Sequence, residues 1–293
     1  MDAPSEKKFS TRKGLVLEGG AMRGLFSAGV MDVLMAHDFR FDAIAGVSAG
    51  AAFGCNYKSG QIGRVLRYNK RFCRDKRFCS WSSLLKTGDL FGADFCYREL
   101  PDHLDPFDRR AFESDPADFW IVCTDVHTGE ARYQLCNQAD EDCFKWMRAS
   151  ASMPFVSRTV AVGGGEYLDG ALADSIPLAF LRSQGCGKNV VILTQPRGYV
   201  KRKQKGMVFF AWALRKYPQL VQSLERRHER YNAALRLVDE LEKKNEIFVF
   251  RPENPLPLGR LCHDPELLQA AYDIGRNQAL RRLPELTAFF KSS

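Results

Sequence analysis

One serine stands in a setting that favours nucleophilic chemistry. The segment Gly46-Val47-Ser48-Ala49-Gly50 matches the G-x-S-x-G nucleophile elbow, and it joins an apolar run at residues 41–45 to small residues at 51–55. On a sharp turn between a strand and a helix, the serine hydroxyl projects above the sheet, and flanking glycines remove Cβ atoms that would clash. The pentapeptide alone is a weak signal, but its strand–turn–helix context makes Ser48 the candidate nucleophile.

A second glycine-rich turn comes earlier in the chain, at Glu18-Gly19-Gly20-Ala21-Met22-Arg23-Gly24. Consecutive small residues ahead of a helix expose backbone N–H groups, which together with the N–H of Ala49 would form an oxyanion hole. A nucleotide-binding loop is the weaker interpretation, because neither the G-x-G-x-x-G nor the G-K-[ST] spacing occurs here. A tight turn with only a packing role stays open as the alternative.

The third element is a carboxylate far downstream, in Asp169-Gly170-Ala171. A nucleophilic serine needs a base, and an aspartate becomes a stronger base when burial raises its pKa. Asp-Gly is also an everyday turn dipeptide, so on its own it would indicate no more than a turn.

The histidines separate two mechanisms. A Ser-Asp-His triad of the α/β-hydrolase type needs a histidine after the serine, and the candidates are His103, His127, His228 and His263. None of them lies in a motif that marks a triad histidine, so a Ser48–Asp169 dyad, with no metal and no cofactor, is the better fit. The triad stays open as one rival, and a binding module for phosphate or lipid without turnover stays open as another.

The elements that must position these residues alternate between strand and helix. Residues 14–17 and 41–45 read as buried strands, and residues 25–36 and 51–55 read as helices. This alternation predicts an α/β fold with a mainly parallel sheet, in which both glycine-rich turns lie at the carboxyl ends of strands. Further strands are expected at 119–124, 160–170 (a hairpin), 189–193 and 247–250, and helices at 142–152, 208–244 and 265–290.

Composition shifts after Pro196, which divides the chain into three parts. We expect a flexible N-terminus at 1–13, a catalytic core at 14–196, and a mostly helical C-terminal extension at 197–293.

Charge and cysteine content restrict partners and compartment. The 43 Lys and Arg residues against 35 Asp and Glu residues give a net charge of +8, which favours anionic partners. Neither zinc-finger spacing nor an RNA-recognition signature is present, so a nucleic-acid partner is not expected. Nine cysteines without a CxxC pair fit free thiols in the cytoplasm, and the short apolar stretches limit membrane contact to a peripheral one.

A strongly basic segment at Arg64–Arg77 has two open interpretations. It is either a solvated helix face with local ion pairs or a surface that steers anionic membranes toward the site. The aromatic residues Phe72, Phe78 and Trp81 interleave with these charges and would pack either into the core or into a lipid interface.

The three motifs together resemble the patatin-like phospholipase family, which pairs a G-G-G-x-R-G loop with G-x-S-x-G and a later D-G-[AG]. The resemblance covers residues 14–196, and the stretches 123–129 and 148–154 also look familial. It implies a three-layer α/β/α fold and a Ser–Asp dyad that hydrolyses lipid acyl esters through an acyl-serine. One departure is Ala21, which replaces the third loop glycine; we expect the alanine to be tolerated with a negative φ. Phospholipids, lysophospholipids, glycerides and thioesters all stay open as substrates.

Overall fold

A computed structural model describes residues 12–291, so most of the predicted flexible start at 1–13 lies outside the described residues. The core is one eight-stranded sheet in the order β5-β6-β3-β2-β1-β7-β8, with β4 also paired to β3. The strands are β1 (Lys13–Leu17), β2 (Ala43–Val47), β3 (Asp118–Asp125), β4 (Ala131–Leu135), β5 (Val160–Val162), β6 (Gly165–Asp169), β7 (Lys188–Ile192) and β8 (Ile247–Phe250). The run β3-β2-β1-β7-β8 is parallel throughout, as the sequence predicts.

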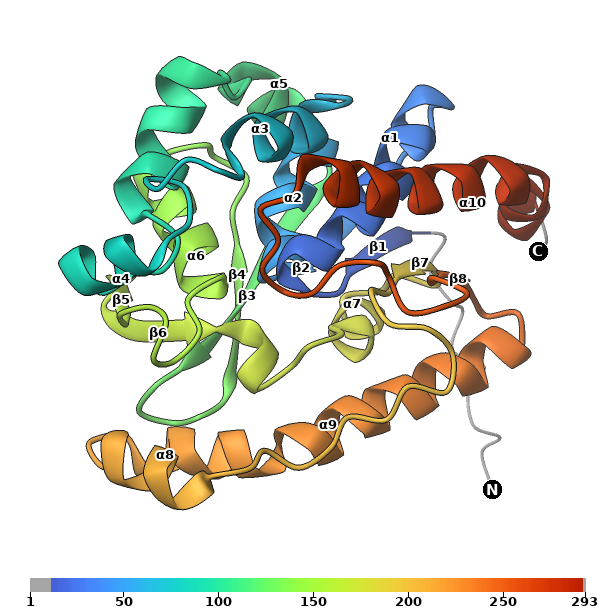
Figure 1. Ribbon diagram of the computed structural model, residues 1–293. Coiled ribbons are helices and arrows are strands. Elements are labelled where there is room, and N and C mark those ends of the chain that lie inside the picture. The colour runs from blue at the N-terminus through green and yellow to red at the C-terminus, as the bar shows by residue number, and fades with distance from the viewer. Residues whose placement is uncertain (1–11, 292–293) are drawn as a thin grey trace, which may run out of the picture.

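Helices cover both faces of this sheet and make a three-layer α/β/α architecture (Figure 1). One face packs on α1 (Gly24–Ala36), α2 (Ala49–Lys58), α3 (Arg64–Phe72), α6 (Glu141–Ser150) and α10 (Pro265–Lys291). The other face packs on α7 (Leu178–Ser183) and α9 (Pro218–Lys243). Strand residues alternate between the two cores, since Leu15 and Leu17 join the first and Val16 joins the second.

Shorter elements connect the layers. They are η1 (Ala21–Arg23), α4 (Trp81–Thr87), a π-helical segment η2 (Phe95–Leu104), α5 (Arg109–Ser114), η3 (Gly170–Leu172) and α8 (Met207–Ala213).

The C-terminal residues share the sheet and its core. Strand β8 pairs with β7, and α10 runs across α1 (Figure 1). The two helices touch backbone to backbone: a Cβ at Gly29 would collide with the carbonyl of Tyr272, and a Cβ at Gly275 with the carbonyl of Phe26. This close approach needs glycine on both helices. The division of the chain at residue 197 stays a prediction.

The helical segment predicted for residues 208–244 is divided into two helices. The chain forms α8 and α9 with a turn between them, and α9 begins at Pro218. Proline has no N–H to donate to the preceding turn, so it starts a helix far better than it continues one.

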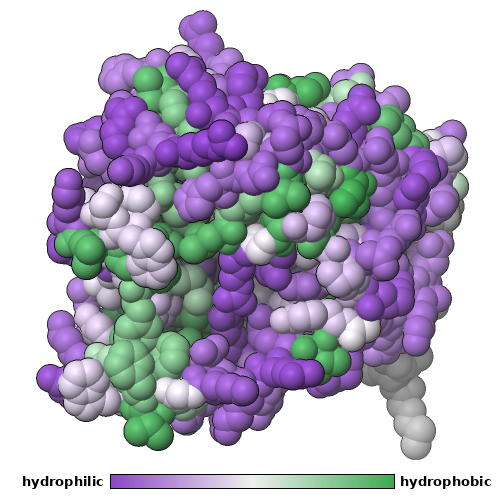
Figure 2. Space-filling model, viewed as in Figure 1, coloured by the Kyte–Doolittle hydropathy of each residue, from purple (hydrophilic) through white to green (hydrophobic). Residues whose placement is uncertain are grey.

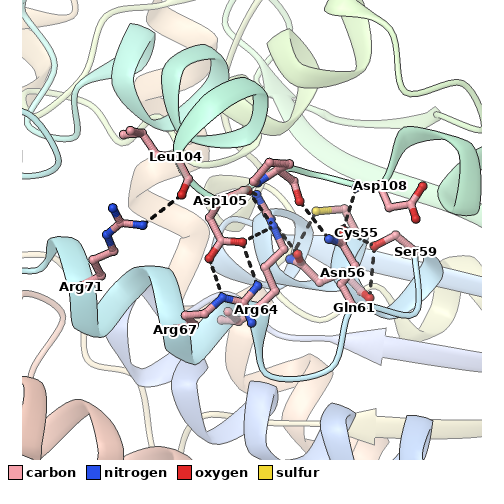
Figure 3. Close-up of polar contacts among 12 residues, drawn as sticks. Cys55, Asn56, Ser59, Gln61, Arg64, Arg67, Arg71, Leu104, Asp105 and Asp108 are labelled. Carbon is pink, nitrogen blue, oxygen red and sulfur yellow. Dashed lines mark hydrogen bonds and ion pairs between the residues drawn. The ribbon is translucent and has the colours of Figure 1, made fainter.

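Part of the basic segment is paired with neighbouring carboxylates, and Figure 3 shows the pairs that Asp105 makes. Asp105 accepts two hydrogen bonds from Arg67, each 2.8 Å long, and also pairs with Arg64. Farther along, Arg77 pairs with both Asp75 and Glu99. Arg64, Arg67 and Arg77 therefore take part in local ion pairs, and the role of the rest of the segment stays a prediction. Of the interleaved aromatic residues, Phe72 and Phe78 are buried, whereas Trp81 is 68% exposed.

Candidate active site

Ser48 occupies a strained turn between β2 and α2. Its backbone has φ 56° and ψ −123°, outside the regions that non-glycine residues prefer, and its side chain is largely buried. The turn is so tight that a Cβ at Gly46 would lie 2.5 Å from the carbonyl oxygen of Gly50. Strain of about 1–3 kcal/mol at one residue persists only where surrounding structure imposes it, and such residues cluster at functional sites.

Strand register brings Asp169 to the same place. Strand β4 pairs with residues 120–124 of β3 and so occupies one edge of that strand. Strand β2 pairs with residues 120–122 and β6 with residues 123–124, so β2 and β6 both lie along the opposite edge, one after the other. On that edge Val47 pairs with Val122, and Asp169 pairs with the next residue, Cys123. The two strands run in opposite directions and end facing each other, which places Ser48 next to Asp169 across 121 positions of sequence.

The end of α6 holds both residues in place. The Ser48 N–H donates to Ser150 Oγ at 2.9 Å, and the Ser150 hydroxyl donates to the Val122 carbonyl at 2.6 Å. Two residues later, the Ser152 carbonyl accepts from the Asp169 N–H at 2.7 Å. The familial stretch 148–154 therefore positions the site, a role that the sequence did not reveal because a serine at a helix end is ordinary.

The Asp169 carboxyl is deeply buried, with 2% of the residue exposed. Burial raises its pKa, although a 2.8 Å hydrogen bond from the Ala171 N–H and the nearby Ser48 hydroxyl act to lower it. No hydrogen bond of normal geometry joins Ser48 and Asp169 among the described residues, as is common in sites without substrate, where such contacts tighten on binding. The raised pKa makes this carboxylate a stronger base.

Within residues 12–291, some backbone N–H groups of the glycine-rich turn are already hydrogen-bonded, and others have no protein acceptor. The N–H of Met22 donates to the Arg260 carbonyl, that of Arg23 to Gly20, and that of Gly24 back to the turn. Within residues 12–291, the amides of Gly19, Gly20, Ala21 and Ala49 have no protein acceptor. The donors available for an oxyanion therefore lie at the start of the turn and at the N-terminus of α2.

The expectation of a negative φ at Ala21 is wrong. Its φ is +49°, not negative, so the alanine occupies the left-handed region that favours glycine. A glycine would adopt this conformation without strain, whereas the alanine holds the turn under strain.

Two cavities meet at Ser48. The first is lined mostly by apolar side chains, with Phe53, Tyr97 and Phe144 among them. The second holds Ser48, Asp169 and Gly19–Ala21 together with several basic side chains. The serine thus stands at the junction of an apolar space and a polar one.

Comparison with known proteins identifies the family. A family model described as patatin-like phospholipase matches residues 15–182, more than half of the chain. The chain belongs to the patatin-like phospholipase family. A second family model, a domain of unknown function (DUF6363), matches residues 217–291, so the C-terminal part of this patatin-like protein has a recognised counterpart as well.

Individual relatives differ in how much they share with this patatin-like chain. The uncharacterized protein YjjU of Escherichia coli K12 is 29% identical over 90% of this chain and 75% of its own length. Lysophospholipase NTE1 of Debaryomyces hansenii is 29% identical over a region that covers 59% of this chain and 11% of the yeast protein. The crystal structure of VipD from Legionella pneumophila matches with a TM-score of 0.47 and 13% identity, over 94% of this chain and 67% of that one.

Histidines lie away from the patatin-like site. None of the five lines either cavity that contains Ser48. His127 stands near Glu166, and His263 contacts the Cys73 carbonyl. Within the described part of the chain, no group of three or more His, Cys, Asp or Glu side chains is arranged to hold a metal ion.

Proposed function

We propose that this chain is a lipid ester hydrolase in which Ser48 is the nucleophile and Asp169 is the general base. One observation carries the proposal: a serine on a strained elbow shares a cavity with a buried aspartate whose pKa is raised. Family membership and the NTE1 lysophospholipases support the class of reaction and of substrate.

The reaction follows from this geometry. Asp169 takes the hydroxyl proton as Ser48 Oγ attacks the ester carbonyl, and the free amides of Gly20, Ala21 and Ala49 stabilise the oxyanion. Asp169 returns the proton to the departing alcohol, leaving an acyl-serine. It then takes a proton from water, whose oxygen attacks the acyl carbon, and returns it to Ser48 as the fatty acid leaves.

The apolar cavity supplies a place for the acyl chain. Ser48 and Ala49 line it, together with side chains of α2, α3, η2 and α6. Burial of apolar chain in such a space favours binding by about 0.8 kcal/mol per CH₂ group, which would select lipid esters over short ones.

Hydrolysis of p-nitrophenyl esters by the native protein and its variants tests the proposal. Ser48→Ala should reduce turnover to background, and Asp169→Asn should lower kcat about 10²- to 10⁴-fold. Ser183→Ala, an exposed serine at the end of α7, is the matched control and should behave as the native protein. Native-like turnover by Ser48→Ala would refute the proposal, and native-like turnover by Asp169→Asn would rule out Asp169 as the base.

We also propose peripheral contact with anionic membranes, through a surface different from the basic segment. Large exposed apolar side chains gather on α4, on α8 and on the loop that carries Phe155; we call them the apolar rim: Trp81, Leu85, Phe155, Val208, Phe209 and Trp212. Figure 2 shows apolar side chains over α4 and α8 at the left of the molecule. No helix in residues 12–291 is long and apolar enough to span a bilayer.

The position of the apolar rim suits a lipid surface. Phe155 contacts Phe209 and lies between Met153 and Ser157, which line the two cavities. Lysines and arginines flank α8 on both sides in sequence: Arg202, Lys203, Lys205, Arg215 and Lys216. Apolar side chains ringed by basic ones bind anionic membranes by insertion and charge together.

A further inference from the structure

Four basic side chains line the second cavity beside Ser48 and Asp169, and we call them the cationic pocket: Arg23, Lys201, Arg227 and Arg260. They come from four separate segments. Arg23 follows β1, Lys201 lies between β7 and α8, Arg227 lies on α9, and Arg260 precedes α10. Lys201, Arg227 and Arg260 also line an adjoining cavity, so the positive lining continues outward.

None of the four has a carboxylate oxygen within 4 Å among the described residues, in contrast to the paired arginines of α3. Other contacts hold Arg227 and Lys201 instead. Arg227 Nε donates to the Ala171 carbonyl at 2.7 Å, and Lys201 Nζ lies 4.2 Å from the centre of the Tyr231 ring. Asn232 bonds both the N–H and the carbonyl of Lys201. The Nε of Arg23 is buried without a partner in residues 12–291.

This arrangement is electrostatically costly without an anion. Burial, with repulsion from Arg227 and Arg260, lowers the pKa of Lys201 to about 7, and burial lowers the pKa of Arg227 too. Among residues 12–291, two carboxylates line the cavity, those of Glu18 and Asp169, and Glu18 already accepts hydrogen bonds from Thr194 and Tyr231. With Lys201 protonated, four cations against two carboxylates leave an excess of two positive charges.

We propose that the cationic pocket binds a phosphomonoester on the alcohol side of the scissile ester, so that the preferred substrates are monoacylglycerol 3-phosphates. The inference rests on the proposed function, since it assigns the second cavity at Ser48 to the leaving group. A phosphomonoester is close to a dianion at neutral pH and matches the excess charge, and arginines bind its oxygens in bidentate fashion. A zwitterionic headgroup would leave that excess uncompensated.

Kinetics with three matched esters test the assignment. Decanoylglycerol 3-phosphate, decanoylglycerol and decanoylglycerophosphocholine share one acyl chain and are compared below their micellar concentrations. The native protein should prefer the phosphomonoester in kcat/KM. Arg260→Ala and Lys201→Ala should each reduce that preference roughly 10- to 100-fold, mainly through KM, because each removes a charged contact to phosphate. Lys201→Arg should retain the preference.

Arg236→Ala is the matched control, since Arg236 is exposed on α9 and lines none of the cavities at Ser48. It should keep the native preference. Equal kcat/KM for the three esters, a preference for the phosphocholine ester, or an unchanged preference in both alanine variants would overturn the assignment.

Free phosphate is the alternative source of the same chemistry. If inorganic phosphate inhibits decanoylglycerol hydrolysis, and Arg260→Ala relieves the inhibition without changing the preference among esters, the pocket serves a free anion and the proposal is wrong. Calorimetry of glycerol 3-phosphate with Ser48→Ala decides the matter without turnover: binding should weaken at least tenfold when Lys201→Ala is added. Turnover of any ester by Ser48→Ala would instead refute the proposed function.

Discussion

Removing two aromatic side chains from the apolar rim should detach the protein from anionic vesicles. Phe209 is 57% exposed and Trp212 65% exposed, so most of each ring is free to enter a lipid surface. Complete burial of a large apolar side chain contributes about 1.5–3 kcal/mol, and these exposed fractions together correspond to about 2–3.5 kcal/mol. The double variant Phe209→Ser/Trp212→Ser should therefore partition about 30- to 300-fold more weakly.

Co-sedimentation with vesicles of phosphatidylglycerol and phosphatidylcholine measures this partitioning. Ile62→Ser is the matched control, because Ile62 is 51% exposed in the turn before α3 and lies outside the apolar rim. Added salt should weaken native binding by screening the basic residues around α8. The reasoning is refuted if the double variant sediments like the native protein, or if Ile62→Ser loses as much binding.

Three further changes test the site. Ala21→Gly should stabilise the protein by up to about 1 kcal/mol in urea unfolding, because release of the positive φ outweighs glycine's greater freedom when unfolded; destabilisation would contradict the strain. The KM for decanoylglycerol 3-phosphate should rise above pH 7, as Lys201 loses its proton, while Lys201→Arg should show a flat KM up to pH 9. The charged and titratable groups that face Lys201 are Arg23, Arg227, Arg260, Glu18, Tyr199, Tyr231, Arg202 and His228. Ala52→Leu, on the α2 wall of the apolar cavity, should shift the preferred p-nitrophenyl ester toward shorter chains; an unchanged profile would place the acyl chain elsewhere.

The sequence predicted the parallel strands well, because each is a short run of apolar residues buried on both faces. It did not predict β4, whose residues Ala131–Leu135 are half exposed and pair only with β3. A strand of that kind lacks the apolar pattern that marks its neighbours. The sequence also did not predict the π-helical segment Phe95–Leu104, because a proline at position 101 is unfavourable inside a helix.

Some residues of the site lie in sequence motifs, whereas others reach it only through the packing of the fold. Ser48, Asp169 and the glycine-rich turn lie in local patterns, so they were recognisable from sequence. Ser150 lies in a familial stretch that gave no sign of its role, and Lys201, Arg227 and Arg260 lie in no recognised pattern. Only the packing of distant segments brings these four residues to the serine. The left-handed backbone of Ala21 was also beyond sequence reasoning, since an alanine gives no sign of positive φ.

The glycine contact between α1 and α10 also has a consequence for the order of synthesis. The hydroxyl of Tyr272 on α10 donates to Asp32 on α1, a residue made 240 positions earlier. On the ribosome, α1 and the turn that precedes it emerge long before the helix that covers them. Until α10 is synthesised, the apolar face of α1 stays exposed and is a target for chaperones. A chain that terminates before residue 265 should therefore aggregate instead of folding.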